Sequence, residues 1–343
     1  MREFAAMIIA WQKLHGRHDL PWQHTRDAYH IWLSEIMLQQ TQVTTVIPYY
    51  RRFLERFPNL AALARAPLDR VLELWSGLGY YSRARNLHRT AQTLIAEHAG
   101  HFPRDVDAVQ ALPGIGRSTA AAICVFTHGS CHAILDGNVK RLFARCFGIA
   151  GYPGDAKVQA QLWRQAQLAL PRQEVEAYTQ GLMDLGATVC TRGKPRCAAC
   201  PLNRRCIAYK SGRIAELPAA RPRKTRPQRR TQMLVLVHSG QVLLEKRVAS
   251  GIWGGLWSLP EIEADGNIRA LCAQRYGAEV SGHEPLPTIA HGFTHFKLDI
   301  EPHKVMVTHV IPRAAAPGVV WLSLEEALGA AIPAPVRRIL AAL

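Results

Sequence analysis

The sequence predicts an all-α domain followed by a smaller α+β domain. Across residues 1–212, apolar stretches of helical length alternate with short breaks rich in Gly, Pro and Asp, and strand-like alternation is scarce. Residues 231–343 open instead with two β-rich runs around His238-Ser239-Gly240, a hairpin signature, and a helix is expected over 265–277. Residues 213–230 carry seven basic residues, one acidic residue and three prolines without periodicity, which is typical of an extended linker.

Composition and charge narrow the class of protein. The 343 residues are 48 % hydrophobic, which is enough for two domains with their own cores. The formal net charge is +16, and residues 1–228 hold 31 Lys and Arg against 16 Asp and Glu, so +15 of it lies there. A polyanion such as nucleic acid would therefore bind mainly the first domain and the linker. A basic surface that is simply solvated explains the charge as well.

The first residues predict an amphipathic helix. The run MREFAAMIIAWQKLHG has polar interruptions and lacks the small-residue cleavage site of a signal peptide. No apolar run approaches the roughly 18 residues of a membrane span. We expect a cytoplasmic monomer, associated with the nucleoid if the source is bacterial, in which cysteines stay reduced and disulfides are rare.

A helix–hairpin–helix is predicted at about residues 106–125. In LPGIGRSTAAAICVF, Gly114 and Gly116 lack Cβ atoms, so the turn can present bare backbone amides. The Ser-Thr-Ala run that follows begins a helix whose N-terminus favours an anion, and Arg117 adds a cation. A DNA phosphate is the ligand that this pattern favours, although an ordinary helix–turn–helix is the plainer interpretation.

Two carboxylates stand out in the first domain. Glu35 lies in WLSEIMLQQTQ amid large apolar residues, where desolvation should raise its pKa and make it a proton donor near neutral pH. Asp136 follows an apolar run in AILDGNVKR and precedes Gly-Asn at the start of a helix. One raised and one ionised carboxylate form the pair that cleaves glycosidic bonds. Glu35 on a solvent-facing helix surface and Asp136 as a mere N-cap remain the alternatives.

Four cysteines are concentrated in CTRGKPRCAACPLNRRC, residues 190–206, at spacings of six, two and five residues. Disulfides are disfavoured in a reducing compartment, whereas zinc, an iron–sulfur cluster and no ligand at all stay open. The remaining cysteines are expected to be ordinary core or surface thiols: Cys124, Cys131, Cys146 and Cys272.

Together these segments resemble the adenine DNA glycosylases of the MutY type, within the helix–hairpin–helix base-excision repair superfamily. The resemblance is carried by LPWQ, WLSEIMLQQTQV, GLGYYSRARNL, LPGIGRSTA, LDGNVKR, MDLGA and the Cys-x6-Cys-x2-Cys-x5-Cys string. It spans residues 1–225 and continues more weakly through the second domain. The combination is specific, although each motif alone is not.

The resemblance implies an enzyme that flips adenine out of double-stranded DNA and hydrolyses it from the sugar when it is paired with 8-oxoguanine or guanine. Glu35 would protonate the base at N7. Ionised Asp136 would stabilise the oxocarbenium ion, directly or by a transient covalent bond. Asn138 would position Asp136 or the backbone.

The resemblance also implies a 4Fe–4S cluster that shapes a DNA-binding loop and takes no part in base cleavage. Its ligands would be Cys190, Cys197, Cys200 and Cys206. The basic residues between the first two ligands would face phosphate: Arg192, Lys194 and Arg196.

Contacts to DNA follow from the same resemblance. Residues expected at the duplex are Gln40 and Tyr80 as wedges, Leu38 and Thr41 near the lesion pair, and Gly114, Gly116 and Ser118 at the hairpin. Residues expected to line the adenine pocket are Trp22, Val43, Gln180 and Met183. Plain helix packing is the alternative for these last side chains.

One position bears on the enzyme subtype. Bifunctional relatives carry a lysine after the hairpin, which attacks the sugar through a Schiff base and then cuts the strand. Ser118 stands at that position and cannot form an imine. A monofunctional glycosylase is therefore expected. Lys140 could trap an abasic site only adventitiously.

The second domain resembles a Nudix fold that reads 8-oxoguanine. GIWGGLWSLPE at 251–261 matches the start of a Nudix region, but the acid cluster that metal-dependent pyrophosphate hydrolysis needs is absent after Asp265. A recognition module without hydrolase activity is expected, with Phe293, Thr294 and His295 in its reading loop. Relatives commonly have Ser at the middle position.

Two other functions fit part of the sequence: a non-catalytic DNA-binding protein and a different glycosylase. A non-catalytic DNA-binding protein would fit the charge, the hairpin and the cysteines, but has no need of the Glu35–Asp136 pair. A glycosylase/lyase for oxidised pyrimidines, similar to endonuclease III, is the other enzyme, and Ser118 and the Nudix-like domain disfavour it.

Overall fold

The computed structural model describes residues 2–222, 225–263, 266–311 and 318–343. Contacts divide the chain into two compact units, Met1–Arg65 with Asn86–Arg223, and Ala66–Arg85 with Lys224–Leu343. In the described ranges no helix is long and apolar enough to cross a membrane.

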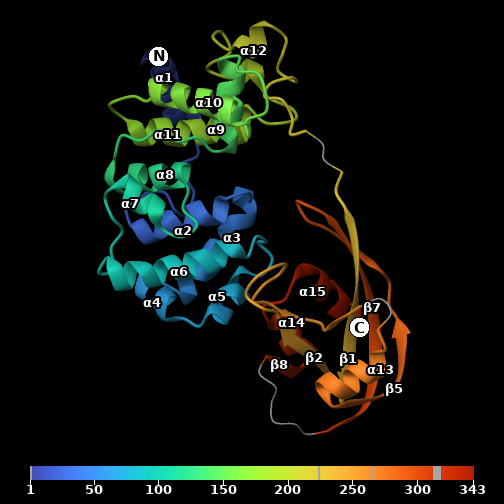
Figure 1. The fold of residues 1–343 in the computed structure, drawn as a ribbon. Coiled ribbons are helices and arrows are strands. Elements are labelled where there is room, and N and C mark those ends of the chain that lie inside the picture. The colour runs from blue at the N-terminus through green and yellow to red at the C-terminus, as the bar shows by residue number, and fades with distance from the viewer. Residues whose placement is uncertain (1, 223–224, 264–265, 312–317) are drawn as a thin grey trace. The chain divides into compact units, whose positions relative to one another are not determined.

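The described residues before 223 form helices joined by short loops, as predicted (Figure 1). These helices are α1 (Arg2–His15), α2 (Ala28–Leu38), α3 (Val43–Arg56), α4 (Leu60–Arg65), α5 (Leu68–Trp75), α6 (Ser82–Glu97), α7 (Val106–Ala111), α8 (Arg117–His128), α9 (Gly137–Cys146), α10 (Ala156–Ala169), α11 (Val175–Asp184) and α12 (Ile207–Lys210). A π-helical turn, Leu185–Val189, continues α11, and a 3-10 turn spans Cys197–Ala199.

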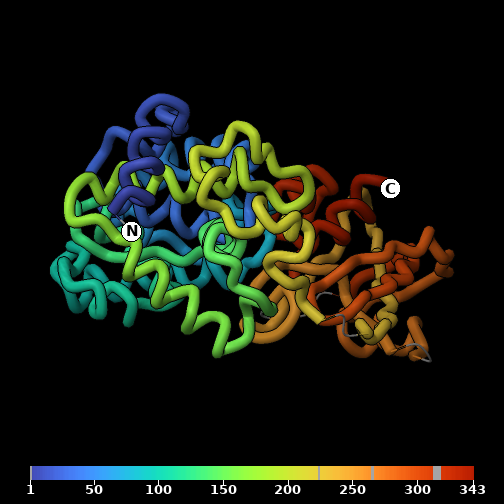
Figure 2. The backbone as a smooth tube through the Cα atoms, turned by 90° about the horizontal axis from the view of Figure 1, so that it is seen from above, coloured from blue at the N-terminus to red at the C-terminus, as the bar shows by residue number. Residues whose placement is uncertain are grey.

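One core of the helical unit joins segments that are far apart in sequence. The N-terminal helix α1 packs against α11 and α10, so the blue and yellow-green parts of the chain lie side by side (Figures 1 and 2). Phe4 and Ile8 of α1 are buried with Phe143 of α9 and Tyr178 of α11. This packing fixes α9 and α11, the two helices that carry Asp136 and the residues before the cysteine loop.

Local sequence explains where the site-bearing helices begin. Asp27 caps α2, and its carboxylate accepts from the backbone N–H of Tyr29 at 2.8 Å. Helix α8 begins after Gly116 and ends at Gly129, whose φ of 68° is the left-handed conformation that favours glycine at a helix end. The predicted helix–hairpin–helix is therefore α7, a short turn and α8.

The second unit contains an eight-stranded sheet in the described residues. Its strands are β1 (Gln228–His238), β2 (Gln241–Lys246), β3 (Trp257–Ser258), β4 (Glu261–Ile262), β5 (Ala278–Pro285), β6 (Ile289–Gly292), β7 (Lys297–Val310) and β8 (Val319–Ser323). The main order is β3-β2-β1-β7-β5, with β4 on β1, β6 on β7 and β8 on β2. The long strands β1 and β7 are parallel, from Gln228 opposite Lys297 to Val237 opposite Met306.

Helices cover both faces of this sheet, because β1 alternates two sets of apolar side chains. Met233 and Val235 pack in a core with residues of α14 (Leu324–Gly329) and α15 (Ala334–Leu340). Leu234 and Leu236 pack in a second core with α13 (Ile268–Leu271) and the π-helical turn Cys272–Tyr276 that continues it.

The predicted hairpin is confirmed, and two boundaries are corrected. His238 pairs with Gln241, so Ser239 and Gly240 form a two-residue turn, with φ values of 47° and 77°. The helix expected over 265–277 begins at Ile268, and its second half is π-helical; residues 264–265 lie outside the described ranges. Strand β1 begins at Gln228, inside the predicted linker, because residues 228–230 pair with the start of β7.

Candidate active site and cysteine loop

A pocket of about 670 Å³ lies in the helical unit. Its walls come from α1, the segment after it, α2, α3, α8 and α11. It collects all four residues predicted to line the adenine pocket, together with Leu38 and Glu35: Trp22, Val43, Gln180 and Met183. The volume falls in the range of roughly 300–1,000 Å³ that small-molecule sites occupy, which is ample for one purine base.

Glu35 is held at this pocket by α2. Its neighbours Ser34 and Ile36 are buried, while Glu35 itself is half-buried on the pocket side. Burial among protein atoms, and next the charge of Asp136, raise the pKa of Glu35 to about 8. The expectation of a raised pKa is confirmed, and a protonated Glu35 is available as a proton donor at neutral pH.

Asp136 is the N-cap of α9, and its Oδ1 accepts from the backbone N–H of Val139 at 2.7 Å. Burial raises the pKa of the Asp136 carboxyl above its ordinary value. Four groups oppose that rise, the backbone N–H groups of Val139 and Asn138 and the cations Arg141 and Lys140. Among the described residues no comparable set of donors acts on Glu35, so the negative charge of the pair is better placed on Asp136. Asp136 can therefore cap α9 and carry a negative charge at the same time.

Asn138 is tied to the cysteine loop through Arg141. Arg141 Nη2 donates to Asn138 Oδ1 at 2.8 Å and to the carbonyl of Gly186 at 2.7 Å, while Arg141 Nε donates to the carbonyl of Cys190 at 2.7 Å. A Cβ on Gly186 would lie 2.5 Å from the Cβ of Asn138, so this close approach requires glycine. Arg141 therefore joins the start of α9 to the chain that carries the first cysteine.

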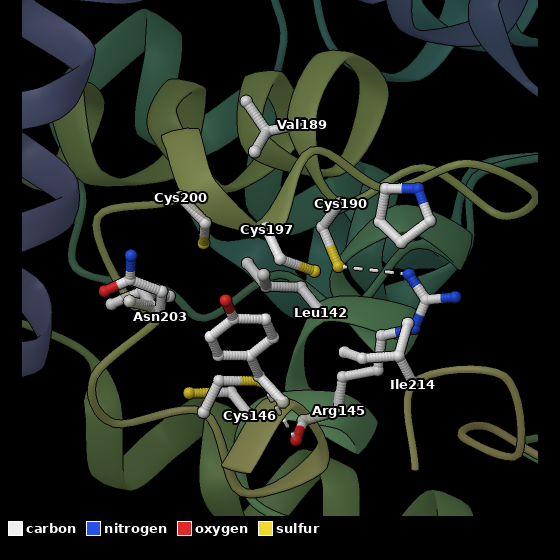
Figure 3. A pocket seen from close by; sticks show the side chains of 13 residues that line it. Leu142, Arg145, Cys146, Val189, Cys190, Cys197, Cys200, Asn203 and Ile214 are labelled. Carbon is white, nitrogen blue, oxygen red and sulfur yellow. Dashed lines mark hydrogen bonds between the residues drawn. The ribbon is translucent and has the colours of Figure 1, made fainter. Parts of the chain in front are cut away.

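The four motif cysteines line a second pocket in the same unit (Figure 3). Arg145 Nη1 lies 3.4 Å from Cys190 Sγ, and Arg145 also donates to the carbonyls of Thr191 at 2.7 Å and Leu217 at 2.8 Å. Cys146 borders this pocket too, although the sequence placed it outside the motif. Of the other cysteines, Cys124 and Cys272 are buried and Cys131 is exposed, as expected of ordinary thiols.

The four motif cysteines supply the donor set of an iron–sulfur cluster, which is bound by four thiolates. In the described ranges, no three Cys, His, Asp or Glu side chains stand where they could hold one metal ion. Burial raises the pKa of the Cys197 thiol, and the charge of the almost fully buried Arg145 opposes that rise.

The hairpin turn has the geometry that phosphate binding needs. Gly114 has a φ of +79°, and a Cβ there would lie 2.7 Å from the Cβ of Asn86. Gly116 is the N-cap of α8, which leaves the first amides of that helix free to point at an anion. Ser118 Oγ accepts from the backbone N–H of Leu135 at 2.9 Å and so ties α8 to the residue before Asp136.

Both predicted wedge residues adopt the left-handed backbone conformation. Gln40 has a φ of 58° and Tyr80 a φ of 50°, which is uncommon for residues other than glycine. Each is exposed, and Tyr80 keeps 49 % of its surface accessible. Thr41 is half-buried beside Gln40. Exposed residues whose backbone is held in this uncommon conformation cluster at ligand-binding sites.

The predicted reading loop is the tight connection between β6 and β7. The Phe293 N–H donates to the Phe296 carbonyl at 2.9 Å, and the two rings stack at 4.6 Å. Phe293 also meets His291 at 4.7 Å and Trp253 at 5.3 Å. Thr294 and His295 between them are exposed. Phe293 therefore anchors the loop and presents its two polar neighbours.

Several pocket residues were missed by sequence reasoning. Arg26 lines the pocket and forms an ion pair with Glu176 at 2.7 Å. Arg17 lines it as well and pairs with Asp184, which is fully buried. Asp184 could have been noticed by the criterion that found Glu35, because it too is an acid amid apolar residues, in LMDLGA.

Comparisons with known proteins agree with this geometry. Residues 33–167 match the family "HhH-GPD superfamily base excision DNA repair protein", and residues 232–342 match "NUDIX domain". Among solved structures, a thermostable thymine-DNA glycosylase has a TM-score of 0.55 at 28 % identity, covering 61 % of this chain and 96 % of that one. Endonuclease III in a non-covalent DNA complex has a TM-score of 0.53 at 22 % identity, covering 62 % and 95 %, and shows the same fold.

The helical unit with its pocket and hairpin therefore defines a base-excision repair glycosylase that binds DNA. The adenine DNA glycosylase of Buchnera aphidicola subsp. Schizaphis graminum is 36 % identical over 98 % of this chain and 97 % of its own length. That of Homo sapiens is 32 % identical over 98 % of this chain and 73 % of its own length. The chain belongs to the adenine DNA glycosylases, enzymes that hydrolyse N-glycosyl bonds.

Proposed function

We propose that this enzyme removes adenine paired with 8-oxoguanine or guanine in double-stranded DNA and leaves an abasic site. The observation that carries the proposal is the pairing of Glu35, with a pKa of about 8, with Asp136, whose charge helps to raise it. Cleavage of a glycosidic bond needs a protonated acid that donates to the leaving group and an ionised carboxylate that stabilises the sugar cation. The pocket that Glu35 lines has room for a purine, so a base flipped out of the duplex could bind there.

The reaction breaks the bond between the deoxyribose carbon C1′ and N9 of adenine. Glu35 donates its proton to N7, so that the bonding electron pair can leave with a neutral base. Positive charge then develops on C1′ and the ring oxygen, and the Asp136 carboxylate stabilises it. Water adds its oxygen to C1′ and gives up one proton to the Glu35 carboxylate, which restores the protonated acid. Asn138, held by Arg141, fixes the start of α9 and with it the Asp136 carboxylate.

The enzyme is monofunctional in this proposal. The Ser118 hydroxyl is occupied by the Leu135 N–H and has no amine chemistry, so no imine with the sugar can form there. Lys140 follows Asp136 by one turn of α9 and acts on that carboxylate as a charge. Strand cleavage should consequently appear only after added alkali or an AP endonuclease.

A 4Fe–4S cluster would be held by Cys190, Cys197, Cys200 and Cys206. When bound, it supplies no acid, base or nucleophile for base cleavage, and its part is to hold the loop. Arg192, Lys194 and Arg196 on that loop are exposed and would face DNA phosphate. Cys197→Ser should lower iron content and DNA affinity together. A colourless, zinc-containing protein with full activity would contradict the cluster.

The second unit would read the base opposite the adenine and hydrolyse nothing. Support comes from the exposed Thr294 and His295 on a loop that Phe293 anchors. The hydroxyl and the imidazole can each donate and accept hydrogen bonds, which suits the altered edge of 8-oxoguanine.

The test of the proposal is base release from synthetic duplexes. The protein should release adenine opposite 8-oxoguanine and guanine, and release no thymine or oxidised pyrimidine. Glu35→Gln should still bind the duplex while releasing little base. Release of oxidised pyrimidines with strand cleavage would instead indicate the endonuclease III-like activity.

A further inference from the structure

Asp184 is a buried carboxylate beside the base pocket that the proposed reaction does not use. It is the last residue of α11 and has no exposed surface. Its Oδ1 accepts from Gln180 Nε2 at 2.9 Å and from Arg17 Nε at 2.7 Å. Arg17 Nη2 also lies 2.6 Å from Oδ1, and the Arg17 backbone N–H donates to Oδ2 at 2.9 Å.

Three of these four donors lie at Oδ1 and one at Oδ2, so both oxygens of the buried carboxylate already have partners. Asp184 is therefore not available to a substrate and can act only through the groups that it holds. A buried ion pair of this kind contributes little net stability, because desolvation offsets much of the attraction. Its main effect is on the orientation of Gln180 and Arg17, and both of these residues line the pocket.

The carboxylate decides which end of the Gln180 amide enters the pocket. A carboxylate only accepts hydrogen bonds, so Gln180 must turn its NH₂ group toward Asp184. The carbonyl oxygen Oε1 is then the end left for a ligand. This part of the pocket wall consequently offers an acceptor, which suits a purine with an amino group and repels one with a carbonyl group.

We propose that Asp184 is a specificity-determining positioning residue, which holds the Gln180 amide so that the pocket admits a 6-aminopurine and excludes a 6-oxopurine. This proposal rests on the proposed function, since it concerns the same base pocket. Adenine carries a donor NH₂ at position 6, whereas hypoxanthine carries an acceptor oxygen there. An acceptor facing an acceptor leaves both without a partner, which a site of this kind penalises by about 10- to 150-fold or more.

The same carboxylate also holds the other wall of the pocket. The carbonyl of Arg17 accepts from Gln23 Nε2 at 2.9 Å, and Gln23 Oε1 accepts from the Leu20 N–H at 3.0 Å. The segment that leads to Trp22 is thus fixed relative to α11 through Asp184. The buried Asp184 carboxylate therefore orients the Gln180 amide and also holds the segment that carries Trp22.

The experiment uses Asp184→Leu in the full chain. Leucine has nearly the size and branching of aspartate but accepts no hydrogen bond, so it no longer holds the Gln180 NH₂ group. The Gln180 amide can then turn and present NH₂ to the pocket. Single-turnover release of adenine and of hypoxanthine, each opposite 8-oxoguanine, should show the adenine-to-hypoxanthine rate ratio falling by about 10-fold or more.

The ratio is the readout because a merely structural defect does not move it. Both rates come from one protein preparation, so a misfolded fraction cancels, and the intrinsic reactivity of the two bases cancels between variants. Glu174→Gln is the matched control, since Glu174 at the start of α11 also pairs with α1, through Lys13, but the pair is exposed and does not line the pocket. Its ratio should equal that of the unaltered protein.

Gln180→Met tests the same idea without disturbing Asp184. It should lower the ratio, and adding Asp184→Leu to it should lower the ratio no further, because Asp184 acts through Gln180. An unchanged ratio in Asp184→Leu or in Gln180→Met overturns the proposal, as does a full second drop in the double variant. Absence of adenine release by the unaltered protein is a separate result, which would refute the proposed function instead.

Discussion

Glu35 and Asp136 are both carboxylates at one site, but their surroundings make them different reagents. Around Glu35, burial and a neighbouring negative charge act in the same direction and raise its pKa. Around Asp136, burial also raises the pKa, but backbone N–H groups and two cations oppose that rise. These groups favour the charged form of Asp136, so we expect the proton of the pair to reside on Glu35, where the proposed reaction requires it.

The pKa of Glu35 has a measurable consequence for the pH dependence of base release. The protonated form is the proton donor, and a raised pKa keeps it populated up to about pH 8. The single-turnover rate should therefore fall at acid pH, where Asp136 becomes protonated, and should fall by about tenfold per pH unit above 8, where Glu35 loses its proton. Glu35→Gln should lose roughly 10²- to 10⁴-fold in rate and show no such fall above about pH 8. A level profile to pH 10 in the unaltered protein would assign the proton to another group.

Asp136 can be tested with its structural role held constant. Asparagine caps helices as well as aspartate does, so Asp136→Asn should keep the bond to the Val139 N–H and the melting temperature. Loss of the negative charge should lower base release by roughly 10²- to 10³-fold. Asp105→Asn is the matched control, because Asp105 caps α7 in the same way, with a bond of 2.9 Å to the Ala108 N–H. If both variants lose stability and only a few-fold in rate, Asp136 serves as a cap alone.

Site residues that stand out in their local sequence could be predicted, and residues defined by contacts between distant segments could not. Glu35 and Asp136 reveal themselves by local context, an acid within an apolar run and an acid before Gly-Asn. Asp184 meets Arg17 across 167 residues, and Arg141 meets Cys190 across 49. No local pattern reports such contacts, because they arise only when α1 packs on α11 and α9 approaches the cysteine loop.

At the scale of elements, α9 links the proposed catalytic carboxylate to the cysteine pocket. It begins directly after Asp136, holds Asn138 in its first turn and ends at Cys146 on the cysteine pocket. Its Arg141 contacts the π-helical turn that continues α11, at the Gly186 carbonyl. π-Helical turns are frequent at functional sites, and this one turns the chain from α11 toward Cys190. Helix periodicity predicts α9 and α11 but carries no signal for the π-helical turn.

Arg141 should couple the cysteine loop to base release. Lysine has one ammonium group in place of the planar fork, so Arg141→Lys cannot keep the bonds to Asn138, Gly186 and Cys190 together. We expect iron content per protein to fall, and the single-turnover rate of the iron-containing fraction to drop about 5- to 150-fold through loss of one or two bonds. Arg164→Lys, at an exposed position of α10, should change neither quantity. Full iron content with an unchanged rate would refute the coupling.

At the scale of the whole molecule, the chain joins two folds, and the proposed function divides the work between them. Every proposed catalytic group lies in the helical unit, and the candidate reading loop lies on the sheet. The sequence predicted this arrangement because the hydrophobic period changes from helical to alternating near residue 230. It did not predict that residues 66–85 cluster with the C-terminal residues, since nothing in their helical pattern marks them as different.

The division of work is best tested with the full chain, because a truncation near residue 225 would also remove the partners of residues 66–85. His295→Ala and Thr294→Ala remove exposed polar groups while Phe293 still anchors the loop on Phe296. Each should leave iron content and release of adenine opposite guanine nearly unchanged. The preference for 8-oxoguanine over guanine should fall by roughly 5- to 150-fold, the value of one or two hydrogen bonds.

The control for this prediction is His309→Ala, at an exposed histidine near the other end of β7. It removes an exposed imidazole at the far end of the strand that follows the loop, so it should keep the preference of the unaltered protein. Single-turnover rates and duplex dissociation constants for the two mispairs give the preference ratio in each protein. Equal ratios in all four proteins would mean that the loop between β6 and β7 does not read the lesion. The helical unit would then have to distinguish 8-oxoguanine from guanine itself, through residues such as Leu38 and Thr41 that follow Glu35 at the end of α2.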